Sequence, residues 1–363
     1  MLRRKKLMLA AAPLLFALFS STFASSVTND VAYQSPNEAV ALNNQAVTLA
    51  GGHRYQEAIE LLQRAIVLRP EVALLHYNLG RIYQAQNQVG KSIEAFQESV
   101  RLDPAFTEAY HFLGVSDNKI ERYADAIKCF RRALQLQPDR ADSLTELGFA
   151  YAKQDLNEEA LECFKAAIRF KPDLADAYNN LGVTYFKLGQ IPEAIKSLEH
   201  ARSIEPDYPD VYDNLGNVYA QAGRVTEAIA LYRQALRLTP DHPETLNNLG
   251  LAYSLLGDNG SAIEAFERAI HFAPAMAESH YNLAYAFSKA GRQKQAIASY
   301  KQALLVKPDF AEAHNNLAIL YVQRGERELA LEQYALLKSI NYELAQKLFT
   351  LIYRDKILNV GQR

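Results

Sequence analysis

The amino-acid sequence predicts an all-α fold, a solenoid of stacked helix pairs. Two observations carry this prediction: prolines recur at a fixed interval of 34 residues, and each interval holds two stretches with apolar residues at helical spacing. With 49% hydrophobic and 22% charged residues, the 363-residue chain has the composition of a folded soluble protein. The prolines are Pro36, Pro70, Pro104, Pro138, Pro172, Pro206, Pro240, Pro274 and Pro308.

Nine repeats follow when each is numbered from 1 to 34 with proline at position 32. Together they fill residues 39–344, and residues 345–363 are expected to form a C-terminal capping helix and tail. Residues 25–38 are predicted to be a short linker, where Ser35-Pro36-Asn37-Glu38 resembles a capping box that opens the first helix. The repeats are 39–72, 73–106, 107–140, 141–174, 175–208, 209–242, 243–276, 277–310 and 311–344.

The two helices of a repeat are predicted from their apolar faces. In the repeat 175–208, Tyr178, Leu181 and Tyr185 share one face of a first helix, and Ala194 and Leu198 share one face of a second. One such pair cannot bury its apolar face alone, so neighbouring pairs are expected to stack around a continuous core.

Small residues at position 8 predict close packing between the helices. A glycine inside a helix costs roughly 0.5–1 kcal/mol relative to alanine, so its recurrence at one register indicates a contact too tight for a larger side chain. Position 8 holds Gly80, Gly114, Gly148, Gly182, Gly216 and Gly250, with alanine in the other three repeats. Glycine also occupies position 15 in the last five repeats, where it is expected to end the first helix in the left-handed conformation.

With this pattern the chain resembles the tetratricopeptide repeat family over all of residues 39–344. It departs from the family pattern at Gln45 and Leu49 in the first repeat, Asp117 in the third and Tyr342 in the ninth. The resemblance implies a right-handed superhelix of nine helix pairs. It also implies a concave groove lined by the first helices at positions 2, 5, 6, 9, 12 and 13.

Asparagines at position 6 are the first candidate binding residues in that groove. An amide matches the C=O and N–H groups of an extended peptide, so a row of amides can hold a peptide by its backbone. The row is similar to the Asn ladder in the repeat arm of the eukaryotic O-linked N-acetylglucosamine transferase. The alternative is that asparagine is common here in the family and bonds locally. The unbroken row is Asn180, Asn214, Asn248, Asn282 and Asn316.

An apolar row is the second candidate. Position 9 holds Phe149, Val183, Leu251 and Tyr285, and Phe186 stands at position 12. Apolar side chains that line a groove mark a partner surface. The acidic residues at position 2 are better explained by the helix dipole, and position 5 lacks the lysine that the carboxylate clamp of chaperone-binding relatives requires.

The N-terminus predicts export. Residues 1–24 have a basic start and an apolar run, Leu7–Phe19, whose length as a helix is only ~20 Å, short of the ~30 Å hydrocarbon core. We therefore expect a signal peptide cleaved near Ala24 and a periplasmic or secreted protein; an uncleaved membrane anchor is the alternative.

Several other functions are disfavoured. Without its first 24 residues the chain has 35 basic and 41 acidic residues, a balance that offers little to nucleic acid. Gly90-Lys91-Ser92 lacks the rest of a phosphate loop, and the histidines, His280 and His314 among them, show no metal-binding spacing, so no cofactor or metal is expected. Cys129 and Cys163 occupy equivalent positions ~9–10 Å apart and are expected to be free thiols.

The sequence therefore predicts an exported, non-enzymatic scaffold or adaptor that binds a peptide segment or protein partner in its groove, in envelope assembly or secretion. Two alternatives remain. One is a substrate-presenting accessory arm of a separately encoded enzyme. The other is a structural homo-oligomer, assembled through the first repeat or through the C-terminal apolar residues Leu348, Phe349, Leu351 and Ile352.

Overall fold

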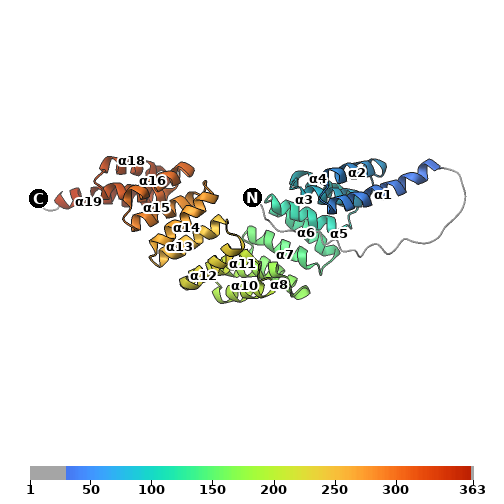
Figure 1. Cartoon of the computed structure of the whole chain (residues 1–363), viewed down its shortest axis with the longest axis horizontal. Helices are drawn as coiled ribbons and strands as arrows, with labels where there is room; N and C mark the ends of the chain where they lie inside the picture. The colour runs from blue at the N-terminus through green and yellow to red at the C-terminus, as the bar shows by residue number, and fades with distance from the viewer. Residues whose placement is uncertain (1–29, 361–363) are drawn as a thin grey trace. The chain divides into compact units, whose positions relative to one another are not determined.

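The structure is a computed structural model that describes residues 30–360, with side-chain burial for residues 37–353. The predicted signal peptide, residues 1–24, lies outside this range. All regular secondary structure in residues 30–360 is helical (Figure 1), as the sequence predicts. The helices are α1 (Asp30–Gly51), α2 (Tyr55–Leu68), α3 (Ala73–Ala85), α4 (Val89–Leu102), α5 (Thr107–Lys119), α6 (Tyr123–Leu136), α7 (Ala141–Lys153), α8 (Asn157–Phe170), α9 (Ala175–Lys187), α10 (Ile191–Ile204), α11 (Pro209–Gln221), α12 (Val225–Leu238), α13 (Pro243–Leu255), α14 (Asn259–Phe272), α15 (Ala277–Lys289), α16 (Gln293–Val306), α17 (Ala311–Gln323), α18 (Arg327–Ile340) and α19 (Tyr342–Val360).

The helix boundaries follow the repeat. From α3 to α17 every odd-numbered helix begins at the first residue of a predicted repeat. Pro209 and Pro243 lie in the first turns of α11 and α13, where the missing N–H is not needed for a helical hydrogen bond. The chain is thus a solenoid of helix pairs.

The N-terminal end differs from the prediction. Helix α1 begins at Asp30, so residues 30–38 are helical rather than a linker, and Pro36 lies within the helix instead of forming part of a capping box. A capping signal is worth only ~1 kcal/mol. Such a signal does not decide where a helix begins when the turns that follow are packed. In α1 the following residues Ala39, Leu42 and Ala46 are all buried.

Contacts divide the chain into two units, Met1–Pro172 and Asp173–Arg363, called here unit 1 and unit 2. Unit 1 contains helices α1–α8 and unit 2 contains α9–α19. Within each unit the two helices of a pair pack together, and the second helix also packs on the first helix of the next pair. At the end of unit 2, α19 packs on α17 and α18 and buries Ala345, Leu348 and Ile352.

The glycines at position 8 face a side chain of the second helix with no room for a Cβ atom between them, which confirms the predicted tight contact. A Cβ atom on Gly216 would lie 2.5 Å from Cε1 of Tyr232, and one on Gly114 would lie 2.8 Å from Cε1 of Phe130. The partner is always the side chain at position 24 of the same repeat. The side chain at position 24, an aromatic ring or, opposite Gly182, Leu198, therefore occupies the volume that any side chain at position 8 would need.

The turn between the two helices of each repeat is left-handed at position 15. In unit 2 this residue is always glycine, with φ between 73° and 77°. In unit 1 the same conformation is adopted by His53, Asn87, Glu121 and Asp155, with φ between 58° and 63°. The predicted role of the five glycines is confirmed, and the first four repeats make the same turn without them.

Candidate protein-binding surface

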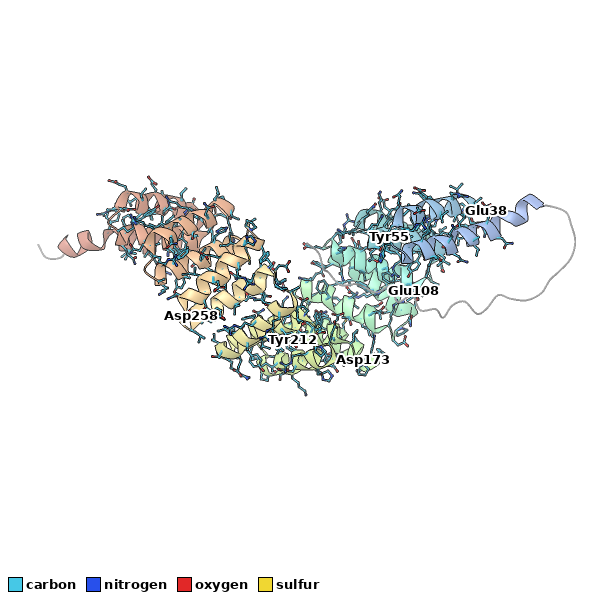
Figure 2. All side chains as sticks on the ribbon, in the orientation of Figure 1. Glu38, Tyr55, Glu108, Asp173, Tyr212 and Asp258 are labelled. Atoms are coloured by element: carbon cyan, nitrogen blue, oxygen red, sulfur yellow. The ribbon has the colours of Figure 1, made fainter. Side chains whose placement is uncertain are left out.

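The first helices of the repeats carry the inner face of each unit. Successive first helices contact one another, as α9 does α11 and α11 does α13, whereas in residues 30–360 no contact of that extent joins successive second helices. On the inside of a curved stack of helix pairs, successive helices lie closer together than on the outside. The first helices therefore form the inside of the stack. We call positions 2, 5, 6, 9, 12 and 13 of the first helices, which the family resemblance places on the concave side, the inner face; Figure 2 draws the side chains on these helices.

Four of the five asparagine amides in the predicted row, those of Asn214, Asn248, Asn282 and Asn316, form hydrogen bonds between repeats. Asn214 Nδ2 donates to Asn179 Oδ1 at 2.9 Å, and Asn282 Nδ2 donates to Asn247 Oδ1 at 2.9 Å. Two further bonds follow the same rule, from position 6 of one repeat to position 5 of the repeat before it. They run from Asn248 Nδ2 to Asp213 Oδ1 at 3.4 Å and from Asn316 Nδ2 to the Tyr281 hydroxyl at 3.0 Å. The local bonding that the sequence left as an alternative is therefore present.

The acceptors of these bonds lie between helix pairs, where the two asparagines are buried and Asp213 and Tyr281 are partly buried. Asn179 is 6% and Asn247 is 7% exposed, and burial raises the pKa of the Asp213 carboxyl above its usual range. A buried acceptor without a donor destabilises the folded state. The amides consequently hold consecutive pairs of unit 2 together, and each uses one N–H to do so. The second N–H groups of Asn214, Asn248 and Asn282 remain for another partner.

The row is interrupted in unit 1 by two residues with partners of a different kind. Phe112 lies against the Arg81 guanidinium, whose carbon is 3.7 Å from the ring centroid. Glu146 Oε2 accepts a hydrogen bond from Asn118 Nδ2 at 3.0 Å. Asn78 Nδ2 keeps the usual bond, to Asn43 Oδ1 at 2.7 Å.

The apolar candidates separate into exposed and packed residues. Leu251 is 40% and Tyr285 is 43% exposed. Phe149 and Val183 are partly buried, and Phe186 packs against the core around α10 and α11. Among these five candidates, Leu251 and Tyr285 are thus the exposed ones.

Leu255 is an exposed apolar residue that the sequence reasoning missed. It is 68% exposed and lies one helical turn after Leu251 on α13, at position 13. Position 13 is lysine in four of the nine repeats, so a leucine there was the available signal. Leu251 and Leu255 form a continuous apolar strip on α13.

The acidic residues at position 2 have partners in the protein. Glu108, labelled in Figure 2, accepts from Arg140 Nη1 at 3.2 Å, and Arg140 Nε donates to Asp142 at 3.0 Å. Asp176 accepts from the Tyr208 hydroxyl at 2.6 Å. In addition to lying in the first turn of a helix, these carboxylates hold the loops between repeats.

One cluster in unit 1 has the residue types of a hydrolytic triad. His111 Nδ1 lies 2.9 Å from Ser143 Oγ, and His111 Nε2 lies 3.6 Å from Asp142 Oδ2. Ser143 has no exposed surface, however, and burial lowers the pKa of His111 to about 4. A serine closed off from solvent cannot reach a substrate, so the cluster is a link between repeats.

The remaining chemical motifs also have structural roles. Gly90, Lys91 and Ser92 lie in the first turn of α4, where Ser92 Oγ donates to Val89 O. His280 and His314 place Nε2 3.0 Å from the carbonyl oxygens of the prolines at position 32. Residues 30–360 contain no group of side chains suited to a metal ion.

The two cysteines are free and protonated. Burial raises the pKa of Cys129 to about 12 and that of Cys163 to about 11, so neither thiol is activated as a nucleophile.

Two further predictions concern membranes and self-association. No helix within residues 30–360 is both long and apolar enough to cross a bilayer. Among the C-terminal residues proposed for an oligomer contact, Leu348 and Ile352 are 2% and 7% exposed because they pack on the last pair, while Phe349 is 38% exposed.

Comparisons with known proteins agree on the architecture. A family model described as the Cilia and flagella-associated protein 70 C-terminal domain, a TPR form, matches residues 105–289, about half of the chain. A TPR repeat model matches residues 287–325, and a tetratricopeptide repeat model matches residues 43–105. The search of curated proteins gives no significant match.

Solved structures with the same fold include the APC/C hetero-tetramer Cut9–Hcn1, with a TM-score of 0.53 and 16% identity over 88% of this chain and 84% of that one. PilF of Pseudomonas aeruginosa matches with a TM-score of 0.51 and 21% identity over 57% of this chain and 93% of its own. MamA matches with a TM-score of 0.40 and 27% identity over 47% and 94%. The first two matches show the helix-pair solenoid.

Proposed function

Because the chain belongs to the tetratricopeptide repeat family, we propose that it is a non-enzymatic scaffold that binds a segment of a partner protein on the inner face of unit 2. Supporting this proposal, a regular array of helix pairs presents a long row of side chains from successive first helices, which suits an extended ligand.

The observation that carries the proposal is the exposed apolar surface of α13 and α15. Leu251, Leu255 and Tyr285 are 40%, 68% and 43% exposed on the inner face. Exposed apolar groups gathered on one face favour a protein partner, and tyrosine is among the residues that dominate binding energy at interfaces. The neighbouring amides of Asn248 and Asn282 each retain one N–H for the backbone of that partner.

We further propose that the protein acts outside the cytoplasm, in the periplasm or after secretion, where it supports envelope assembly or secretion. The support is the basic start and the apolar run of residues 1–24. N-terminal sequencing of the protein from its native host tests this. A chain that begins near Ser25 is expected, and an intact Met1 on a soluble intracellular protein contradicts export.

Binding is tested by applying a protein comprising residues 25–363 to an array of random 12-residue peptides and identifying the peptides that it binds. Peptides selected on the wild type are measured by fluorescence polarisation against the triple variant Leu251→Ala, Leu255→Ala and Tyr285→Ala. Loss of one interface hot spot costs ~2 kcal/mol, so we expect binding to weaken about 30-fold or more.

The matched control is Leu305→Ala on α16, because Leu305 is 76% exposed in the same unit but lies on a second helix. It should bind the peptides as the wild type does. Equal binding by the triple variant and the wild type would move the binding surface away from α13 and α15.

A further inference from the structure

We propose that Arg81, on the inner face of unit 1, is an anchor for a carboxylate of a partner-protein segment bound on unit 1. The proposal rests on the proposed function, since it names a chemical group that the partner carries. It concerns unit 1 alone and uses none of the residues proposed above for unit 2.

The Arg81 side chain is held in place by aromatic neighbours. Its guanidinium carbon lies 3.7 Å from the ring centroid of Phe112, and its Nη1 donates to the Tyr77 hydroxyl at 2.8 Å. The Tyr77 ring is itself packed, with its centroid 4.9 Å from that of Phe106 and 6.0 Å from that of Phe96. A guanidinium stacked on a ring is pre-organised, so a ligand need not order it.

Arg81 has no acidic partner within the part of the chain that the structure describes. No carboxylate oxygen there lies within 4.0 Å of a guanidinium nitrogen of Arg81. The Tyr77 hydroxyl is the hydrogen-bond acceptor for this side chain. Arg140 in the same unit, by contrast, is paired with both Glu108 and Asp142. One of the five N–H groups of Arg81 is used, and the planar fork that remains matches a carboxylate.

The helix dipole does not account for this charge. Cations are favoured in the last turn of a helix, which explains Lys119 at the end of α5 and Lys153 at the end of α7. Arg81 lies earlier in α3, and the last turn of α3 contains no basic residue. The position of Arg81 therefore calls for another explanation.

The break in the asparagine row supports the same reading. Phe112 replaces the amide that links repeats elsewhere, and its ring supports the guanidinium instead. The acids nearby on this face are engaged: Glu146 accepts from Asn118, and Glu108 and Asp142 accept from Arg140. The charge left without a partner is positive, and so a carboxylate complements it.

The experiment is a double-mutant cycle on those peptides from the array described above that the triple variant of unit 2 still binds. We expect the wild type to select peptides rich in Asp and Glu, or peptides that require a free C-terminal carboxylate. Amidated and free-acid versions of each peptide, and versions with Asn for Asp and Gln for Glu, separate these two sources. Arg81→Ala should weaken binding of such peptides about 10- to 100-fold. Neutralising the peptide carboxylate should weaken wild-type binding by a similar factor and add little in the variant.

Two further variants keep the result interpretable. Arg81→Gln removes the charge but keeps a donor for Tyr77, and it should show the same loss if Arg81→Ala proves unstable. Arg132→Ala on α6, where Arg132 Nη2 donates to Pro104 O, is the control and should bind as the wild type does.

The anchor is overturned, and the proposed function left in place, if these peptides bind both Arg81 variants as tightly as the wild type, or if every selected peptide loses its binding to the triple variant of unit 2. Failure to select any peptide would overturn both.

Discussion

The cores of units 1 and 2 are packed in the same way, whereas their inner faces differ. In both, a glycine at position 8 faces the ring or branched side chain at position 24: Gly114 and Phe130 in unit 1, Gly216 and Tyr232 in unit 2. On the inner face, unit 2 repeats the same amide bond from pair to pair, whereas unit 1 has Phe112 under Arg81. The repeat thus constrains the contacts between helices and leaves the inner face free to differ.

The links between repeats show the same contrast. Unit 2 joins its pairs with amides to buried polar acceptors, such as Asn282 to Asn247, with Ser279 Oγ donating to the same oxygen at 3.2 Å. In unit 1, His111 occupies position 5 and meets Ser143 at position 3 of the next repeat. A polar residue at position 5 therefore serves as the link in both units, and its chemistry is variable.

The largest expected effect comes from removing the amide links of unit 2. Replacing Asn214, Asn248 and Asn282 together by Ala should lower the free energy of unfolding by about 2–5 kcal/mol, because each change removes a hydrogen bond between repeats. Asn214→Ala also leaves the buried Asn179 Oδ1 without its donor, whereas Ser279 still donates to Asn247. Urea unfolding followed by circular dichroism measures it. Asn78→Ala removes one such link in unit 1 and should cost about a third as much. A triple variant as stable as the wild type would show that the amides do not hold the repeats together.

The second prediction concerns the contact between positions 8 and 24, which occurs in the core of each unit. Gly216→Leu should destabilise the protein by about 1–3 kcal/mol, since the Tyr232 ring already occupies the space at its Cβ. Leu is the better helix former by up to ~1 kcal/mol, so propensity alone predicts the opposite sign.

Gly90→Leu on α4 is the control for this change, because nothing lies within 4 Å of the Cβ position at Gly90. It should leave the urea midpoint unchanged or raise it. A raised midpoint for Gly216→Leu as well would contradict a close contact.

The third prediction uses a buried acid found only in unit 1. Asp117 is 4% exposed, and burial raises its pKa to about 6, with the Asp125 charge adding to the effect. The folded-state pKa lies above the ordinary value of ~3.9, so this carboxyl favours folding below pH ~4 and opposes it as the pH rises through 6.

Asp117→Asn should therefore raise the free energy of unfolding by about 1–2 kcal/mol at pH 8 and change it little at pH 4. Urea titrations at the two pH values test this. An equal effect at both would assign the change to packing rather than to charge.

The smallest expected effect concerns the turn at position 15. Glu121 adopts φ 63° in unit 1, where glycine stands in unit 2. A left-handed conformation costs a residue with a side chain ~1–2 kcal/mol, of which the greater freedom of unfolded glycine cancels a part. Glu121→Gly should stabilise the protein by about 0.5–1 kcal/mol, and Gly257→Glu should destabilise it by a similar amount. Thermal melting of the two variants should show shifts of opposite sign, and shifts of the same sign would contradict the argument.

The sequence by itself determined the helix pairs, their boundaries and the close contact at position 8. These features depend on interactions within one repeat, and the repeat pattern that indicates them occurs nine times in the sequence. It was wrong at the start of α1, where one local capping signal stood against the packing of Ala39, Leu42 and Ala46.

Only the tertiary structure decided what the inner-face side chains do. The sequence pattern does not distinguish an asparagine at position 6 that faces a ligand from one that bonds to the preceding repeat. The distance from Asn214 Nδ2 to Asn179 Oδ1 shows that Asn214 bonds to the preceding repeat. The surroundings of Arg81 likewise could not be derived from the pattern, because its contact with Phe112 joins residues about 30 positions apart in the chain. Leu255 departs from the lysine common at position 13, but only the structure gives its exposure. Periodicity reports which residues face the core; the partners of the others are set by how consecutive helix pairs meet.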